Sequence, residues 1–190
     1  FNMEVGDGDR KQLMSGTIDR VDICENGTDV YVRIIDYKTG KKDFNIVKTY
    51  YGIDIQLMVY MEAAMKLVAK MRPGKNVIPA GVFYYNISDP IVSATTESAE
   101  EIEDKIKGEL RLKGMVNSDK DIAEKMDNTE GTSLNIPVSR KADGGFDSRR
   151  SKVMNTEQFN MLGRFVDART VDTADRIAGG DIRRSPYKDG

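Results

Sequence analysis

The sequence predicts a mixed α/β domain, and two observations lead to this class. Segments rich in β-branched residues alternate along the chain with segments whose apolar residues recur every three or four positions. Their order is strand, strand, helix, strand, helix, with further helices toward the C-terminus. We therefore expect a central mixed sheet flanked by helices, with extra helices in the C-terminal half.

The expected strands are rich in β-branched and aromatic residues with partial alternation of apolar and polar positions. Four segments have this pattern: residues 1–5, 11–23, 30–37 and 77–87. Between the second and third strands, Asn26 and Gly27 form a turn, because this pair tolerates the positive φ that a tight hairpin needs. The second and third strands are therefore expected to form an antiparallel hairpin.

Helical spacing of apolar residues marks the expected helices. These are residues 44–50, 54–71, 97–112, 119–126 and 156–178. The pattern is strongest in the second of them, where Leu57, Met61 and Val68 share one face. Residues 127–152 are polar and rich in Gly and Ser, which predicts an irregular or mobile insertion.

Composition excludes several kinds of chemistry. The 190 residues contain no histidine, so no imidazole base or ligand comes from this chain. A single cysteine, Cys24, excludes an intrachain disulfide framework and a self-contained cysteine metal cluster. No membrane span or signal-peptide pattern is present, so we expect a cytoplasmic protein with no membrane partner. Carboxylates, lysines and hard metal ions remain as the available chemistry.

The first hairpin brings acidic residues to one face of the sheet. Asp36 and Lys38 share a face at the end of one strand, and Asp19 ends the apolar stripe of the other. A loop centred after Gly27 places Asp19 opposite Asp36, whereas a two-residue turn at Asn26 and Gly27 places the two aspartates diagonally. Either register leaves their Cβ atoms roughly 5 to 8 Å apart on one face.

Two carboxylates at this distance from each other, beside a hydrophobic core, do not both ionise readily unless a cation lies between them. A hard ion such as Mg²⁺ or Mn²⁺ suits this pair and leaves coordination positions for water and phosphate oxygens. The ammonium of Lys38 is placed to stabilise developing negative charge or to orient an attacking water. Gln56 and Tyr60, one helical turn apart, are expected to reach back toward Asp36 and Lys38.

Each of these features alone has a simpler interpretation, since aspartates at strand ends are usually solvated and Asp-x-Lys is often only a surface ion pair. The hypothesis of a catalytic site depends on their combination. The net charge of -2 does not favour DNA binding, although local basic stretches are present. Those stretches are residues 140–141, 149–152 and 183–184, each more simply explained as solvated loop charge.

With these residues in place, the chain resembles the RecB-like branch of the PD-(D/E)XK nuclease superfamily. The three motifs that carry the resemblance are G-x-x-D at residues 16–19, D-x-K at residues 36–38 and Q-x-x-x-Y at residues 56–60. Within that branch, the chain is similar to the nuclease domains of bacterial helicase-nuclease complexes. The supporting stretches are residues 50–52, 80–87, 89–90, 180–181 and 186–188. The resemblance implies a single nuclease domain over residues 1–190, cut from a larger protein.

The resemblance also implies a restriction-endonuclease-like core and a set of site residues. Asp19, Asp36 and the backbone carbonyl of Tyr37 would bind Mg²⁺ or Mn²⁺, and Lys38 would be the catalytic lysine. Glu4 is the candidate for the upstream acidic ligand that this branch usually has. Gln56 and Tyr60 would support the catalytic group. The residues expected to contact DNA are Arg20, Gln56 and Tyr60.

The implied activity is Mg²⁺-dependent exonucleolytic hydrolysis of DNA during the repair of double-strand breaks. The implied partners are a single-stranded DNA end produced by unwinding and a partner subunit of a helicase-nuclease complex. An iron–sulfur cluster is expected in the full-length parent but not in this chain, because Cys24 is the only cysteine and stands at the wrong place. Two alternatives stay open: a free-standing RecB-like exonuclease and a catalytically silent DNA-binding or scaffolding module.

Overall fold

The computed structural model describes residues 1–6, 8, 11–87, 89–92 and 98–184. A five-stranded sheet in the order β3-β4-β5-β6-β7 forms its centre, and β1 and β2 form a separate two-stranded sheet. The strands are β1 (Asn2–Val5), β2 (Gln12–Ser15), β3 (Arg20–Asn26), β4 (Asp29–Lys38), β5 (Asn76–Asn86), β6 (Lys113–Asn117) and β7 (Val153–Met154). The helices are α1 (Ile46–Tyr50), α2 (Gln56–Met71), α3 (Ala99–Leu110), α4 (Lys120–Met126) and α5 (Thr156–Ala178).

Both parallel and antiparallel pairs occur in the central sheet. β4 pairs with β3 antiparallel and with β5 parallel, and β6 pairs with β5 antiparallel and with β7 parallel. The expectation of a mixed sheet flanked by helices is therefore confirmed. Among the described residues, no helix is long and apolar enough to cross a bilayer.

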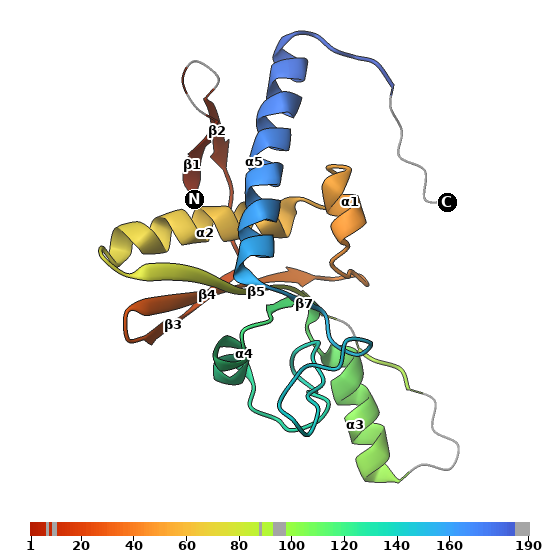
Figure 1. Cartoon of the computed structure of the whole chain (residues 1–190). Coiled ribbons are helices and arrows are strands. Elements are labelled where there is room, and N and C mark those ends of the chain that lie inside the picture. The colour runs from red at the N-terminus through yellow and green to blue at the C-terminus, as the bar shows by residue number, and fades with distance from the viewer. Residues whose placement is uncertain (7, 9–10, 88, 93–97, 185–190) are drawn as a thin grey trace.

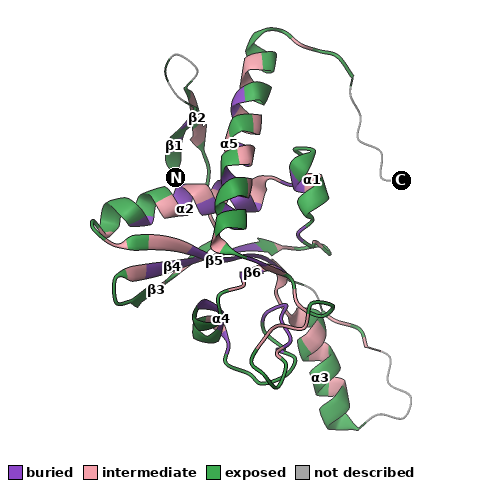
Figure 2. Cartoon of the chain, viewed as in Figure 1, coloured by how far each residue is buried: buried purple, intermediate pink, exposed green. Residues whose placement is uncertain are grey.

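Helices and loops cover both faces of this sheet (Figure 1). On one face lies α2, and α5 begins at the sheet on the same side and crosses α2. On the other face lie α3, α4 and the irregular segment 127–152. Burial is concentrated where α2 meets β4 and β5, whereas α3 contains no buried residue (Figure 2).

The central strand β4 contributes to the core on both faces. Its even-numbered residues Val30, Val32 and Ile34 pack with α2 in the larger hydrophobic cluster. Ile35 and Tyr31 point to the opposite face and join the smaller clusters there. A strand covered on both sides has a nearly continuous apolar sequence, which explains the run VYVRII.

The β3–β4 hairpin has the first of the two registers considered above. Asn26 pairs with Asp29, and Arg20 pairs with Ile35. The turn is possible because Gly27 has a φ of 60°, a value that glycine adopts without strain. Continued by one residue, this register places Asp19 opposite Asp36.

Residues 11–23, expected to be one strand, form two strands that belong to different sheets. β2 pairs with β1, while β3 begins only at Arg20 and pairs with β4. The chain changes partner near Gly16, whose N–H donates to Phe1 O at 3.0 Å. β-Branched content marks extended backbone but does not reveal which strand each part pairs with.

Two strands, β6 and β7, were missed because they are short and carry little periodic signal. Gly114 allows β6 to pair with β5, since a Cβ at this position would lie 1.9 Å from Val82 O. The segment 127–152 has no helix and no strand beyond two isolated bridges, but Ile136 and Val138 are fully buried. It is therefore part of a hydrophobic cluster as well as a loop. Residues 97 and 186–188, used in the expectations above, lie outside the described residues.

Candidate active site

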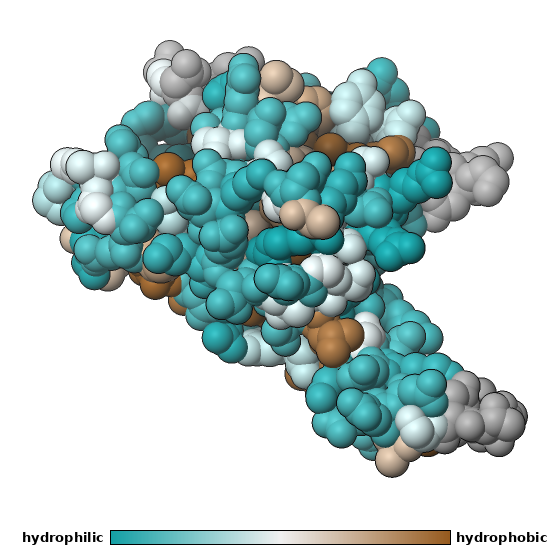
Figure 3. Space-filling model, turned by 60° about the horizontal axis from the view of Figure 1, so that its bottom comes forward, coloured by the Kyte–Doolittle hydropathy of each residue, from teal (hydrophilic) through white to brown (hydrophobic). Residues whose placement is uncertain are grey.

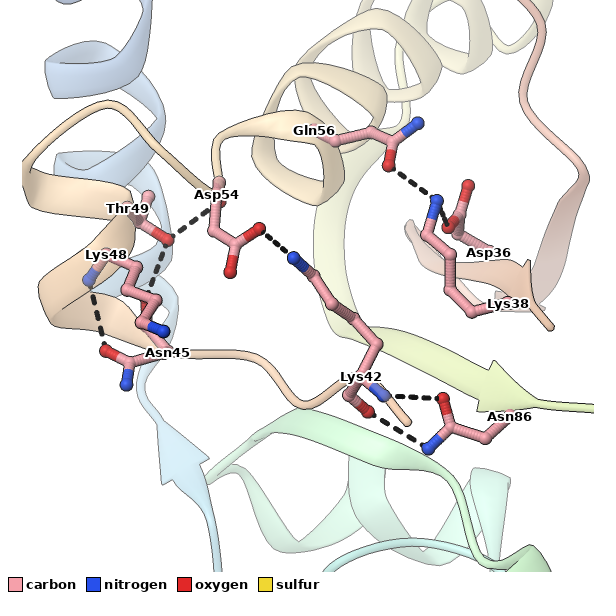
Figure 4. A network of polar contacts seen from close by, with 9 residues as sticks. All are labelled: Asp36, Lys38, Lys42, Asn45, Lys48, Thr49, Asp54, Gln56 and Asn86. Atoms are coloured by element: carbon pink, nitrogen blue, oxygen red, sulfur yellow. Dashed lines mark hydrogen bonds and ion pairs between the residues drawn. The ribbon is translucent and has the colours of Figure 1, made fainter. Parts of the chain in front are cut away.

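A chain of polar contacts joins the end of β4 to the start of α2. Lys38 Nζ lies 2.5 Å from Asp36 Oδ2 and donates a hydrogen bond of 2.8 Å to Gln56 Oε1. Gln56 Nε2 in turn donates to the hydroxyl of Tyr60 at 2.8 Å. Figure 4 shows Asp36, Lys38 and Gln56 pointing toward one another from these two elements. Four of the five side chains predicted as catalytic, all except Asp19, are therefore linked in one chain of contacts.

The fold explains why they meet. Asp36 and Lys38 continue the even-numbered face of β4, which is the face that α2 covers. Gln56 is the first residue of α2, and Tyr60 follows one turn later on the same side of the helix. The ring of Tyr60 packs edge-on against Phe1, with ring centroids 5.8 Å apart.

Asp36 is a buried carboxylate with incomplete hydrogen bonding. The residue is 2% exposed, and its Oδ2 atom accepts no hydrogen bond although it forms the ion pair with Lys38. Buried carboxylate oxygens without hydrogen bonds are costly, and each one calls for an explanation. The Lys38 ammonium provides part of it, and a metal ion bound at Asp36 would neutralise the carboxylate further.

Asp19 lies beside this group on the neighbouring strand. Its Oδ2 atom accepts a hydrogen bond of 2.9 Å from the backbone N–H of Tyr37, the residue between Asp36 and Lys38. The Asp19 side chain is exposed, unlike that of Asp36. The bond holds the Asp19 carboxylate at the end of β4, where the hairpin register places it opposite Asp36.

These groups fit a hard divalent ion. Asp19 and Asp36 supply carboxylate oxygens from adjacent strands, and the Tyr37 carbonyl is a further oxygen in the same segment. Within the described ranges, no cluster of three or more His, Cys, Asp or Glu side chains is placed to hold a metal. Water and phosphate oxygens would therefore complete the coordination, as is usual for Mg²⁺. Cys24, half-buried on β3, is the chain's only thiol, so no iron–sulfur cluster can be built from these residues.

Three residues of the site were not predicted. Asp54 is buried just before α2 and forms an ion pair with Lys42, as Figure 4 shows. Tyr84, on β5 opposite Asp36, is near both lysines: Lys38 Nζ is 5.6 Å and Lys42 Nζ is 5.7 Å from its ring centroid. Burial, together with the negative charges of Asp54 and Asp36, raises the pKa of Tyr84. The only sequence signal was proximity, since Lys42 and Asp54 stand four and two residues from Lys38 and Gln56.

Glu4, the expected upstream acidic ligand, is not brought to this group. It is exposed on β1 and forms an ion pair of 2.9 Å with Lys11, whose hydrogen bond and charge lower the pKa of Glu4. The charge of Lys70 lowers it further. Lys70 is 14 residues beyond Gln56 on α2, about 21 Å along the helix axis. Glu4 therefore lies toward the far end of α2.

Arg20, expected to contact DNA, lies on the opposite face of the sheet. It pairs with Ile35, and its guanidinium donates to Asp22 Oδ1 at 2.9 Å. Together with Tyr37 and Tyr85, Arg20 lines a hollow of about 640 Å³ on that face. Arg20 is therefore near the end of β4 but separate from the Lys38 group.

Comparison with known proteins gives consistent matches over the chain. A family model described as the PD-(D/E)XK nuclease superfamily matches residues 1–189. The curated relatives are named as the B subunit of an ATP-dependent helicase/deoxyribonuclease. Those of Thermoanaerobacter sp. (strain X514), Caldanaerobacter subterraneus subsp. tengcongensis and Clostridium kluyveri (strain NBRC 12016) are 38%, 41% and 35% identical over 92%, 91% and 99% of this chain.

The chain spans about 15 to 16% of the length of these relatives. The matches confirm both resemblances predicted from the sequence. The broad one is to the PD-(D/E)XK superfamily, and the narrower one is to the helicase-nuclease component also called AddB. The mixed sheet flanked by helices agrees with the restriction-endonuclease-like core that the broad resemblance implied.

Proposed function

The chain belongs to the PD-(D/E)XK nuclease superfamily, and from this membership we propose its function. Its activity is Mg²⁺-dependent hydrolysis of phosphodiester bonds in DNA, with Mn²⁺ as an alternative ion. The observation that carries this proposal is the meeting of Asp36, Lys38 and Gln56 at the end of β4, with the Asp19 carboxylate bonded to the Tyr37 N–H beside them.

Each side chain has a role that follows from its position. Asp36, Asp19 and the Tyr37 carbonyl would hold the ion, which would lower the pKa of a bound water and offset phosphate charge. The Lys38 ammonium stabilises negative charge that develops on the phosphoryl oxygens. Gln56 accepts a hydrogen bond from Lys38 and so fixes where its ammonium lies. Tyr60 accepts from the Gln56 amide and orients it.

The wider setting follows from the relatives' name. We place this domain in a helicase-nuclease complex, acting as an exonuclease on a single-stranded DNA end during repair of double-strand breaks in the cytoplasm. Similarity to segments of much longer relatives favours this setting over a free-standing exonuclease. A full-length parent would supply the additional cysteines for an iron–sulfur cluster. Gln56, Tyr60 and Arg20 remain proposed DNA contacts.

The test is degradation of end-labelled single-stranded DNA with Mg²⁺ or Mn²⁺, comparing the unmodified chain with Asp36→Asn and Lys38→Ala. We expect cleavage by the unmodified chain and its loss in both variants. Glu130→Ala serves as the control, because it removes an exposed carboxylate far along the chain from the site. Cleavage that persists in Asp36→Asn, or metal-loaded chain that never cleaves, would contradict the proposal; the second result would favour a silent DNA-binding module.

A further inference from the structure

A groove beside the candidate site gathers positive charge. It has a volume of about 390 Å³, and five cationic but only two acidic side chains line it, an excess of three positive charges. The cationic residues are Lys41, Lys42, Arg111, Lys113 and Lys152. We name this feature the basic groove. The whole chain has a net charge of -2, so the excess is a local property.

Sheet register connects the basic groove to Asp36. Asp36 pairs with Tyr84 across β4 and β5, and Tyr84 pairs with Lys113 across β5 and β6. Paired residues share a face of the sheet, so Asp36, Tyr84 and Lys113 form one row on the face that α2 covers. Two strand spacings separate the Cα atoms of Asp36 and Lys113, about 10 Å. Asn86 and Lys42 also line the basic groove, and the Asn86 side chain bonds both the backbone N–H and the backbone carbonyl of Lys42, as Figure 4 shows.

The cations differ in whether a carboxylate already neutralises them. Lys42 pairs with the buried Asp54, and Lys152 Nζ lies 2.5 Å from Asp43 Oδ2. The other three, Lys41, Arg111 and Lys113, form no ion pair with any residue in the described part of the chain. Arg111 donates to Ser133 O at 3.2 Å and Lys113 donates to Gly108 O at 3.4 Å, but these carbonyls carry no formal charge, so the positive charges of the three side chains are not neutralised by a carboxylate.

Lys113 shows the effect of this crowding. Its burial, and then the positive charge of Arg111, lower its pKa, and Lys152 acts in the same direction. The opposing effects of Glu109 and Asp43 do not cancel the shift. An anion bound between Lys113 and Arg111 would relieve their repulsion.

We propose that the basic groove binds the phosphate backbone of a DNA strand, at phosphates next to the one that is hydrolysed, through Lys41, Arg111 and Lys113. This inference rests on the proposed nuclease function, because the strand in the groove is the strand being cut. Two observations favour a DNA strand as the ligand: the groove is positively charged, and its Lys113 lies in the same row of the sheet as Asp36. Contacts to phosphates alone do not read sequence, so binding through this groove is independent of sequence. The face seen in Figure 3 is mainly hydrophilic, with apolar residues in small separate patches.

The experiment measures how binding depends on salt. Lys41→Gln and Lys113→Gln are combined in a chain that also carries Asp36→Asn, and EDTA excludes cleavage. Fluorescence anisotropy gives the affinity for a labelled single-stranded oligonucleotide at salt concentrations from about 25 to about 200 mM. Counterion release makes the affinity fall with salt over this range. Two lost phosphate contacts should make the slope of log K against log salt less negative by about 1.4 and weaken binding on the order of tenfold.

Two matched variants separate a contact from a general effect of charge or folding. Lys70→Gln with Lys125→Gln removes the same two charges from exposed sites outside the basic groove and should change the slope much less. Lys41→Arg with Lys113→Arg keeps the charges and should keep the slope. The proposal is overturned if the groove variant has the slope of its parent, if the control variant loses as much, or if the parent shows no salt-dependent binding, as expected of a groove for an acidic protein segment.

Failure of the groove and failure of the nuclease function give different results. In the chain with Asp36 intact, the groove variant should raise KM for DNA. A chain that cleaves DNA while its groove variant keeps both KM and the salt slope contradicts the groove alone. A chain whose salt slope responds as expected, yet which never cleaves with metal, contradicts the nuclease function alone.

Discussion

Two buried aspartates of this domain have opposite hydrogen-bonding environments. Asp127, at the start of the irregular segment, accepts from Ser133 Oγ at 2.6 Å, Asn135 Nδ2 at 2.9 Å and the Thr129 N–H at 2.8 Å. Asp36, at the end of β4, has an oxygen, Oδ2, that forms an ion pair with Lys38 and accepts no other hydrogen bond. Both residues are nearly inaccessible, with exposed fractions of 8% and 2%.

The difference separates a structural carboxylate from a candidate functional one. Burial would raise the pKa of Asp127, but hydrogen bonds from Ser133, Thr129 and Asn135 outweigh burial and lower it to about 2. That carboxylate organises a loop and needs nothing further. Asp36 is held by packing and by its ion pair with Lys38, in a group that also contains Gln56. The four predictions that follow compare these two sites.

The largest effect is expected from Asp36→Asn. Loss of a metal-binding carboxylate should reduce cleavage on the order of a thousandfold. The melting temperature should change by no more than about 4 °C, because the substitution keeps the shape of the side chain. Cleavage rates and thermal unfolding of the same preparation check both parts. A large loss of stability with little loss of cleavage would make Asp36 structural and erase the contrast with Asp127.

Asp127→Ala should have the reverse effect. It removes the acceptor of three hydrogen bonds, one of them from the buried Ser133 hydroxyl, which we expect to cost about 3 kcal/mol of unfolding free energy. For a domain of this size the melting temperature should fall by about 6 to 12 °C. Activity per folded molecule should persist at low temperature. Glu130→Ala, an exposed position in the same segment, should leave the melting temperature in place; equal losses in the two variants would argue against a special role of Asp127.

The contribution of Asp127 to stability should also depend on pH. A carboxyl group with a depressed folded pKa stabilises the fold above its unfolded pKa, and that contribution is lost as pH falls through the folded value. For Asp127 the loss therefore lies between about pH 4 and pH 2 and amounts to about 2 kcal/mol. Urea unfolding across this range should show a steeper decline for the unmodified chain than for Asp127→Asn. Parallel declines would contradict the assigned pKa.

The smallest effects are expected in the residues that position Lys38. Gln56→Met removes the acceptor of the Lys38 hydrogen bond and should lower kcat about tenfold with KM nearly unchanged. Tyr60→Phe removes only the acceptor for the Gln56 amide, and about threefold is expected. Rescue of most activity by Gln56→Glu, which can still accept from Lys38, would support a positioning role. A change confined to KM in all three variants would indicate DNA contacts instead.

Sequence patterns were sufficient for the main elements and for the group around Lys38. The alternation in β4 and the four-residue spacing of Gln56 and Tyr60 are local signals, and α2 lies over the face of β4 that they require. The family match covers residues 1–189, the range that contains these motifs. These features depend on periodicity and order, both of which a sequence displays.

Other features depend on pairings that no local pattern encodes. The break between β2 and β3, and the row from Asp36 through Tyr84 to Lys113, follow from strand partners chosen in three dimensions. Asp54 and Lys42 meet because the segment between them, which contains α1, folds back on itself, and no local pattern in the sequence indicates this. Glu4 was expected near Asp36 from chain order, but β1 pairs with β2 instead of with the central sheet.

Calorimetric titration with Mn²⁺ tests the contrast between the two aspartates most directly, since it requires neither DNA nor catalysis. The unmodified chain, Asp36→Asn and Asp127→Asn would be titrated under the same conditions. We expect binding by the unmodified chain and by Asp127→Asn, and at least tenfold weaker binding by Asp36→Asn, a difference of about 1.4 kcal/mol. Equal Mn²⁺ affinity in Asp36→Asn and the unmodified chain would contradict the assignment of Asp36 as the metal-binding carboxylate.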